Sequence, residues 1–192
     1  MPPCARCPKL LGRSCCEPGP EDKLTTLTRA DVARIAAHTG RSERAFVETE
    51  WLTQSEAFDY ETRRPIFAGY FRAEPKRLTL SRRGEACVFH DPASGCTLPG
   101  DVRPVACRLY PFEPWPDGTL AIVPERHGDL ARAQEEGGAC LGVEEANDLE
   151  ELLARFETSA RELRALASQL VEDVHAHGRT SAQRASRPPR GP

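Results

Sequence analysis

Cysteine is the residue type in this chain whose number and spacing could support chemistry. The 192 residues include 8 cysteines, which fall into an N-terminal group, a middle group and a single late residue. In chain order they are Cys4, Cys7, Cys15 and Cys16, then Cys87, Cys96 and Cys107, and finally Cys140. Thiolates are soft ligands that select zinc, copper(I) or iron–sulfur clusters over calcium and magnesium. We therefore expect these side chains to ligate metal, at two sites or at one site with spare thiols.

The spacing within the cysteine groups supports this expectation. Cys4 and Cys7 are separated by two residues, the gap that lets neighbouring thiolates converge on one ion. A turn-forming Asp-Pro-Ala-Ser-Gly sequence between Cys87 and Cys96 predicts a hairpin that brings these two residues face to face at its open end. Cys107 would then close the site from the following helix.

Other side chains near the middle group bear on the predicted site. Arg103 and Arg108 lie close to Cys107, and their charge would offset the negative charge of a thiolate-rich centre. His90 is the histidine best placed to ligate, but such a residue is usually a surface or hydrogen-bonded side chain, so we leave it outside the ligand set. No pair of acidic residues stands out as catalytic.

Two other interpretations of the cysteines stay open, namely thiols buried in an apolar core and a framework of disulfides. The N-terminus has no basic flank followed by an apolar run, so the sequence predicts no secretory signal and a cytoplasmic protein, in which disulfides do not persist. No stretch reaches the roughly 18 apolar residues of a membrane helix. The net charge of −3 argues against general nucleic-acid binding, which needs a basic face.

Short elements are expected to position the cysteines. Thr28 and Asp31 predict the start of a helix that ends at Gly40, and Ser42 predicts the cap of a second short helix that extends toward Leu52. Four short strands are predicted, at 77–81, 87–90, 96–98 and 120–123.

Further elements follow from proline and aromatic residues. Pro104 and Pro111 predict the first position and the end of a short helix that carries Cys107. Phe67, Tyr70 and Phe71 are candidate core residues.

Residues 144–177 form the clearest predicted element, a single long amphipathic helix. Its apolar side chains recur at spacings of four and three residues from Leu149 to Val174, which makes one apolar stripe. Acidic residues crowd its start, where they suit the positive end of the helix dipole. The stripe predicts packing on this domain, with a dimerising coiled coil as the alternative. Residues 178–192 are polar and rich in arginine, and they predict a disordered tail.

Together these elements predict a mostly helical α+β fold, with short strands and loops around a cysteine-ligated metal centre and a long C-terminal amphipathic helix. Residues 1–143 would form the cysteine-cluster domain, 144–177 a packing helix of the same domain, and 178–192 a disordered basic tail. Because large apolar side chains are sparse, a bound metal would add to the free energy of folding.

Several segments of the chain match one known pattern of cysteines. The matching residues are Cys4, Cys7, Cys15 and Cys16, then Cys87-Val88-Phe89, Cys96, the Arg-Pro-x2-Cys-Arg-x2-Pro-Phe segment 103–112, and Cys140-Leu141-Gly142. In these residues the chain resembles the bacterial and archaeal YkgJ-like cysteine-cluster family, which is described as a zinc- or iron-chelating domain. The helix segment 27–35, with Thr28, Asp31 and Arg34, is also similar to the family's segment after the N-terminal cysteines.

The chain departs from the family signature in two places. Seven residues lie between the second and third cysteines of the N-terminal group, where the signature has two. The segment between Cys96 and Arg103 holds Leu98-Pro99-Gly100, where the usual form has an Ile-Tyr pair. The resemblance implies metal chelation as the general function, and the ligands that fit the signature best are Cys16, Cys87, Cys96 and Cys107.

Three classes of function follow from this pattern. The favoured one is a metal-binding protein that holds an iron–sulfur cluster of the 4Fe–4S type, or zinc, through its cysteines. The second is a cluster-dependent enzyme, either an oxidoreductase or one similar to the flagellin lysine N-methylases, which carry a related cysteine cluster. The third is a zinc-stabilised interaction module that pairs with a second copy, or with another protein, through residues 144–177.

Overall fold

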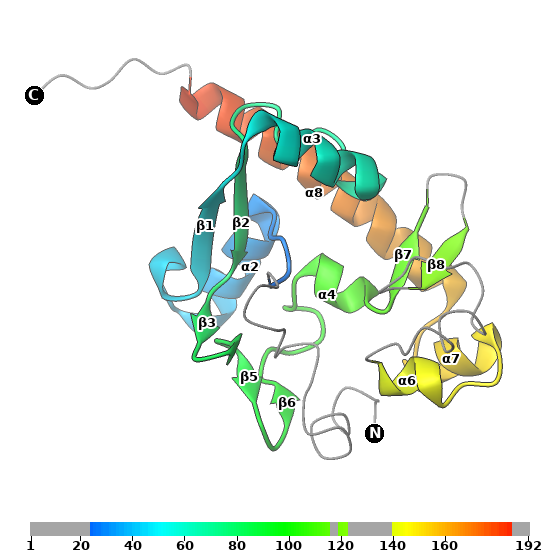
Figure 1. Ribbon diagram of the computed structural model, residues 1–192. Helices are drawn as coiled ribbons and strands as arrows, with labels where there is room; N and C mark the ends of the chain where they lie inside the picture. Colours follow the sequence, from blue (N-terminus) through cyan, green and yellow to red (C-terminus); the bar gives the residue numbers. More distant parts are fainter. Residues whose placement is uncertain (1–23, 116–118, 123–139, 186–192) are drawn as a thin grey trace, which may run out of the picture.

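The computed structural model describes residues 24–115, 119–122 and 140–185, and these form a mixed α+β fold (Figure 1). Two strands, β1 (Val47–Trp51) and β2 (Lys76–Leu80), pair antiparallel along their full length. Thr26 bridges to Thr79, so the segment before the first described helix pairs with β2 as well. These elements confirm the predicted α+β class and the strand predicted at 77–81.

Helix α2 (Arg29–Thr39) begins and ends where the sequence predicts. The Thr28 hydroxyl accepts a hydrogen bond from the amide of Asp31, and the Asp31 carboxylate accepts one from the amide of Thr28, which completes a capping box. Gly40 ends the helix with a φ of 66°, a left-handed conformation that favours glycine. Local sequence therefore determines both ends of α2.

The region after Gly40 differs from the predicted second helix. A short 3-10 turn, η1 (Glu43–Ala45), forms there, and the chain then enters β1. Val47 and Thr49 are β-branched, so this segment suits a pleated strand. Pairing with β2 then satisfies its backbone groups, and the strand forms in place of the helix.

Helix α3 (Gln54–Arg63) and the 3-10 turn η2 (Pro65–Phe67) connect the two strands of the sheet. The aromatic residues predicted for the core lie in and after η2. Phe67 and Tyr70 are buried and Phe71 is half-buried, so the core prediction is confirmed for the first two and in part for the third.

Two very short hairpins follow the sheet. Strand β3 (Arg82–Arg83) pairs with β4 (Ala86–Cys87), and β5 (His90–Asp91) pairs with β6 (Gly95–Cys96). The continuous strand predicted at 87–90 is therefore wrong, because the chain divides these residues between two hairpins.

Helix α4 (Val105–Leu109) comes next, followed by the hairpin of β7 (Phe112–Pro114) and β8 (Leu120–Ile122). Pro104 is the N-cap of α4, one position before the place that the sequence predicts for it. The strand predicted at 120–123 is confirmed for the residues of β8, and its last residue lies outside the described part of the chain.

The C-terminal part is not the single helix predicted over 144–177. It forms three helices, α6 (Leu141–Glu144), α7 (Leu149–Arg155) and α8 (Ala160–Ala185). After α7, Glu157 has a φ of 52°, which is outside the helical region. The Ser159 hydroxyl then accepts a hydrogen bond from the Glu162 amide and donates one to its carboxylate, so a new side-chain cap starts α8.

Helix α8 extends to Ala185, so the disordered tail predicted from residue 178 is wrong for 178–185, which are helical. Residues 186–192 of that predicted tail lie outside the described residues. The stripe residues Leu163, Leu170 and Val174 are buried in the chain's own core. Pairing of two copies through 144–177 stays a prediction. None of the described helices is long and apolar enough to cross a membrane.

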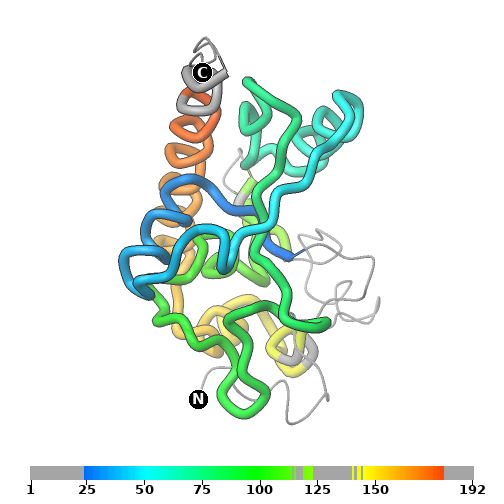
Figure 2. The backbone as a smooth tube through the Cα atoms, turned by 90° about the vertical axis from the view of Figure 1, so that its left-hand side faces the viewer, coloured from blue at the N-terminus to red at the C-terminus, as the bar shows by residue number. Residues whose placement is uncertain are grey.

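Buried apolar side chains form two clusters. The N-terminal cluster packs α2 against β2 and the short hairpins, and its members include Leu27, Ile35, Phe46, Leu78 and Phe89. The C-terminal cluster packs α8 against η2, α4 and β7, and its members include Phe67, Val105, Phe112, Leu163 and Leu170. Figure 2 shows α2 beside α8, so these two helices connect the parts of the fold that hold the clusters.

Gly178 marks a close approach between α8 and the loop after η2. A Cβ atom at this position would lie 2.4 Å from the backbone oxygen of Gly69. Gly69 itself has a φ of 85°, a left-handed conformation that other residues rarely adopt. The packing of α8 on this loop therefore requires that position 178 carry no side chain.

We predict that Gly178→Ala destabilises the protein. Alanine raises helix propensity by about 1 kcal/mol, but removing the clash with Gly69 requires a shift of backbone, toward the upper end of the roughly 1–3 kcal/mol that overpacking costs. The midpoint of urea unfolding should fall. Ser168→Ala, on the exposed side of the same helix, should leave it unchanged or raise it, and an unchanged midpoint for Gly178→Ala would contradict the close approach.

A buried histidine on α8 was not among the predicted site residues. His177 is 3% exposed, and its ring stacks on Tyr70 with the ring centroids 4.0 Å apart. Its Nδ1 atom is buried and has no hydrogen-bond partner in the described part of the chain. Burial, with smaller effects from Arg29 and Lys76, lowers the pKa of His177 to about 4. The imidazole is therefore neutral in the folded protein at neutral pH.

His177 should make the fold less stable in acid. Its pKa is about 4 in the folded protein and 6.5 in an unfolded chain, so the unfolded state takes up the proton first as the pH falls. This group therefore lowers the free energy of unfolding progressively from about pH 6.5 to pH 4, by up to about 3 kcal/mol.

The measurement is the free energy of unfolding as a function of pH in this range. His177→Phe keeps a ring against Tyr70 but cannot bind a proton, so its slope should be shallower than that of the wild-type protein. His175→Gln, an exposed neighbour, should keep the wild-type slope. A wild-type slope in His177→Phe would assign the acid sensitivity to other groups.

Candidate metal centre

Cys87 and Cys96 lie in different hairpins and do not face each other across one. Cys87 in β4 is opposite Arg82, and Cys96 in β6 is opposite His90. The predicted pairing of the two cysteines is therefore wrong. Because the hairpins follow each other directly, the cysteines still share one short segment of chain.

The turn between β5 and β6 is the turn that the sequence predicts. Asp91 Oδ1 accepts hydrogen bonds from the Ser94 hydroxyl and amide at 2.8 Å each and from the Ala93 amide at 3.0 Å. These bonds lower the pKa of Asp91, so the carboxylate stays ionised and holds the turn. Gly95 follows with a φ of 79° and leads the chain into Cys96.

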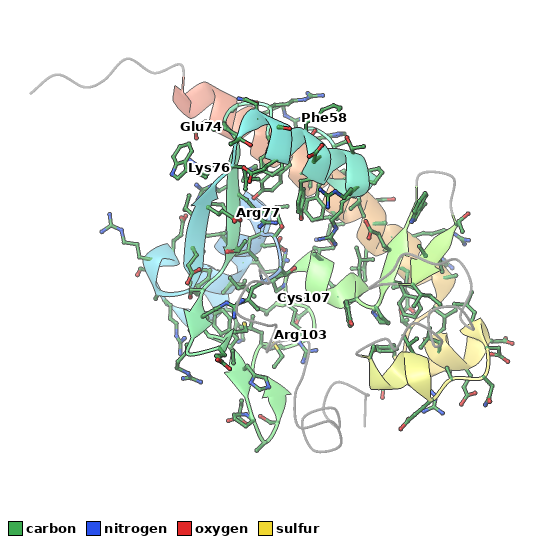
Figure 3. The ribbon with its side chains drawn as sticks, viewed as in Figure 1. Phe58, Glu74, Lys76, Arg77, Arg103 and Cys107 are labelled. Atoms are coloured by element: carbon green, nitrogen blue, oxygen red, sulfur yellow. The ribbon has the colours of Figure 1, made fainter. Side chains whose placement is uncertain are left out.

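Arg103 ties the segment after Cys96 to the helix that carries Cys107. Its Nε donates to the carbonyl oxygen of Leu98 at 3.0 Å, and its Nη2 lies 3.5 Å from the carbonyl oxygen of Cys96. Figure 3 labels Cys107 on α4 and Arg103 in the segment that leads into this helix. This guanidinium, which the sequence predicts to offset thiolate charge, donates to backbone carbonyls and so fixes the loop between the two cysteines.

Cys107 projects from the side of α4 that faces away from the C-terminal cluster. Val105 and Leu109 are buried in that cluster, whereas Cys107 lies about half a turn round the helix from them and is half-buried. The packing of α4 against α8 therefore determines the direction in which Cys107 points.

Asp31 on α2 fixes the start of α4. Its buried carboxylate accepts hydrogen bonds from the Thr28 amide and hydroxyl at 2.9 Å each, from the Arg34 guanidinium, and from the Val105 amide at 3.0 Å. Arg34 also donates to the carbonyl oxygen of Arg103 at 3.2 Å. Helix α2 thus holds the segment that leads into α4.

This second role of Asp31 was missed in the sequence. The capping pattern of Thr28 and Asp31 is the same in kind as that of Thr53 and Glu56, which caps α3 at an exposed position. The similarity of the segment 27–35 to the family pattern was the one signal that singled out Asp31, and it did not indicate a contact with α4.

The other predicted ligands are Cys140, which the structure describes, and the N-terminal group, which it does not. Cys140 is buried in the C-terminal cluster, whereas Cys87 belongs to the N-terminal cluster. The N-terminal group lies outside the described residues, and its members are Cys4, Cys7, Cys15 and Cys16. Within 24–115, 119–122 and 140–185, no three His, Cys, Asp or Glu side chains are grouped so that they could hold a metal ion. A complete metal site therefore needs ligands from beyond these ranges.

Two charged groups, Arg108 on α4 and Asp173 on α8, have pKa values shifted from their ordinary range. Burial, and then repulsion from Arg34, lowers the pKa of Arg108, which directly follows Cys107. Burial also raises the pKa of Asp173 on α8, and the nearby charge of Asp31 acts in the same direction. The junction of α2, α4 and α8 therefore contains charges of both signs that are partly shielded from water.

Comparison with known proteins yields no relative from which a function could be carried over. No family model matches the chain, and neither a curated protein nor a solved structure matches it. The resemblance to the YkgJ-like family therefore stays a prediction that rests on the motif residues alone.

Proposed function

We propose that the protein binds a metal centre through cysteine thiolates, with Cys87, Cys96 and Cys107 as ligands from the described residues. The observation that carries the proposal is the set of contacts that holds the segments of Cys96 and Cys107. Arg103 ties the backbone after Cys96 to the start of α4, and Asp31 holds that start against α2. Such contacts orient ligand-bearing segments, as second-shell contacts do in metal sites.

The shortness of the two hairpins gives further support. Each hairpin pairs two residues with two, and isolated hairpins of this size are unstable in water. Segments of this kind in small metal domains gain their stability when thiolates from neighbouring loops bind one ion. A metal centre would therefore supply the stability that the pairing in 82–96 does not.

The remaining ligands in this proposal come from the N-terminal group. The described residues alone do not group three donors, so a four-thiolate site needs members of the set Cys4, Cys7, Cys15 and Cys16. Cys140 is the last of the eight predicted ligands, and it lies in the C-terminal cluster.

The number of thiols favours an iron–sulfur cluster over zinc. Eight cysteines exceed the four that one structural zinc ion needs, so we favour a cluster of the 4Fe–4S type, which would support electron transfer. Zinc would instead act as a structural ion. Because thiolates persist in a reducing compartment, the proposal places the protein in the cytoplasm.

Metal analysis of the full chain, purified without oxygen, tests the proposal. Iron with an equal amount of sulfide and a broad visible absorption would identify a cluster, and stoichiometric zinc in a colourless protein would identify a zinc site. A folded protein that contains neither metal would overturn the proposal.

A further inference from the structure

Strand β1 has an open edge. Strand β2 is paired on both of its sides, because it bonds to β1 on one side and to the segment before α2 on the other. On that second side the Leu27 amide donates to the carbonyl oxygen of Leu78 at 2.8 Å. Among the described elements β1 pairs with β2 alone, and it lies at the outer side of the sheet (Figure 1). Three of its five residues are exposed, so its outer edge is open to solvent.

The register identifies the backbone groups at this edge. In antiparallel pairing, successive residues of a strand direct their backbone groups alternately to one side and to the other. The Leu52 amide, just after β1, donates to the carbonyl oxygen of Pro75 at 2.8 Å, so the even-numbered residues bond to β2. The N–H and C=O groups of Val47, Thr49 and Trp51 therefore point outward. They have no hydrogen bond within the described ranges.

The side chains of β1 also differ between its two faces, because they alternate along a strand. Val47, Thr49 and Trp51 share one face, which is apolar or β-branched, and Trp51 is 66% exposed. Glu48 and Glu50 share the other face, which is acidic. A strand added at the open edge would thus meet an apolar row on one face and an acidic row on the other.

The two acidic residues differ in the charge that they can offer. The Glu50 carboxylate accepts hydrogen bonds from the guanidinium of Arg77, which lies opposite it on β2. The exposed Glu48 carboxylate accepts a bond from the backbone amide of Arg82 at 3.3 Å and has no ion pair within the described part of the chain. Glu48 is therefore the main source of negative charge at this edge.

We propose that this edge binds an extended segment of another protein in which lysine or arginine alternates with apolar or β-branched residues. Such a segment would add a strand to the sheet through main-chain hydrogen bonds to Val47, Thr49 and Trp51. Its cations would lie beside Glu48, and its apolar side chains would cover Trp51. Pairs of opposite charge, and pairs of an aromatic with a β-branched residue, both stabilise neighbouring strands.

A second copy of the chain fits the edge less well. Two β1 strands that pair antiparallel about Thr49 would place Glu48 of each copy beside Glu50 of the other, and like charges directly opposite each other destabilise a sheet. A basic segment satisfies both faces of the edge at once. This surface goes beyond the proposed metal centre and does not depend on it, since β1 contains none of the predicted cysteine ligands.

NMR titration of the full chain with a capped peptide of the same length as β1 tests the proposal. The peptide carries valine or threonine at its odd positions and lysine at its even positions, and the control peptide carries glutamate in place of lysine. We expect saturable shifts of the amide signals of Val47, Thr49 and Trp51, with slower hydrogen exchange at these amides. The glutamate peptide should bind about tenfold more weakly or less.

Two substitutions on β1 sharpen the test. Thr49→Pro removes the outward N–H at the centre of the edge and leaves the bonds to β2 in place, so it should abolish binding. Thr49→Val is its matched control, because it keeps the N–H and suits a strand, and it should bind like the wild-type protein. Glu48→Gln should weaken binding of the lysine peptide about two- to fivefold, which tests the charge even if the proline variant does not fold.

Three results would overturn the proposal. The first is the absence of saturable binding of the lysine peptide by the wild-type protein, and the second is equal binding of the glutamate peptide. The third is association of the protein with itself without peptide, with slower exchange at the amides of Val47, Thr49 and Trp51, which would assign the edge to a second copy. Circular dichroism confirms that each variant is folded.

Discussion

Replacement of Cys87 and Cys107 by serine in one chain is expected to abolish metal binding and to lower the stability of the fold. A serine hydroxyl is a poor ligand for metals that prefer thiolates, so the double variant removes two of the donors that the proposal assigns. Structural zinc contributes on the order of 10 kcal/mol to the folding of small metal-dependent domains. The two cysteines lie on β4 and α4, so their loss would also release the link between the hairpins and this helix.

Metal content per chain and the thermal unfolding midpoint are the two measurements. The matched control carries Ala86→Ser and Ala106→Ser, because each alanine is the neighbour of one cysteine on the same element. We expect the control to keep its metal and to unfold close to the wild-type temperature. If the cysteine variant keeps its full metal content, these two residues are not ligands. If the control loses metal to the same extent, the loss comes from disturbed packing.

The parts of the fold that local chemistry determines could be predicted from the sequence. Thr28 and Gly40 bracket α2 because the cap and the left-handed glycine each act within a few residues. The break before α8 had a signal of the same kind, the cap that Ser159 provides for the Glu162 amide, but the long apolar stripe favoured an unbroken helix. Strand β1 could not be predicted in this way, because its partner β2 lies on the far side of α3 in the sequence.

In the candidate site too, features set by local hydrogen bonds could be predicted from the sequence, and features set by pairing between segments could not. The turn at Asp91 was predictable because its hydrogen bonds join residues two and three positions apart. The register that places Cys96 opposite His90 could not be predicted, because a two-residue ladder has too few side chains to specify one register over another. Nor could the sequence reveal that Arg103 bonds to carbonyl groups, because a guanidinium near cysteines has several chemically reasonable partners.

Asp31→Asn is expected to destabilise the fold and to weaken metal retention. The Asp31 carboxylate faces four donor groups, and an asparagine side chain would turn its own NH2 group toward at least one of them. One buried donor would then lose its acceptor, and the partly buried Arg34 would lose its counter-charge. Such losses cost about 2–4 kcal/mol together.

Glu56→Gln is the matched control for this substitution. Glu56 occupies the same position in the capping box of α3, where its carboxylate accepts hydrogen bonds from the amide and hydroxyl of Thr53 at 2.7 and 2.8 Å. That box is exposed, so water can replace a lost bond, and we expect a much smaller change in stability. Urea unfolding at pH 7 measures the stability of both variants, and the rate of metal loss to a chelator measures metal retention.

The two measurements separate a capping role of Asp31 from a positioning role. If Asp31 acted as a cap alone, its substitution would resemble Glu56→Gln and would leave metal retention unchanged. The hydrogen bond from Val105 reaches Asp31 across 74 positions of the sequence and sets the start of the helix that carries Cys107. We therefore expect Asp31→Asn to lose metal to the chelator faster than the wild-type protein. The rates are compared without urea, so that both proteins are folded. Equal rates would show that α4 keeps its position without this contact.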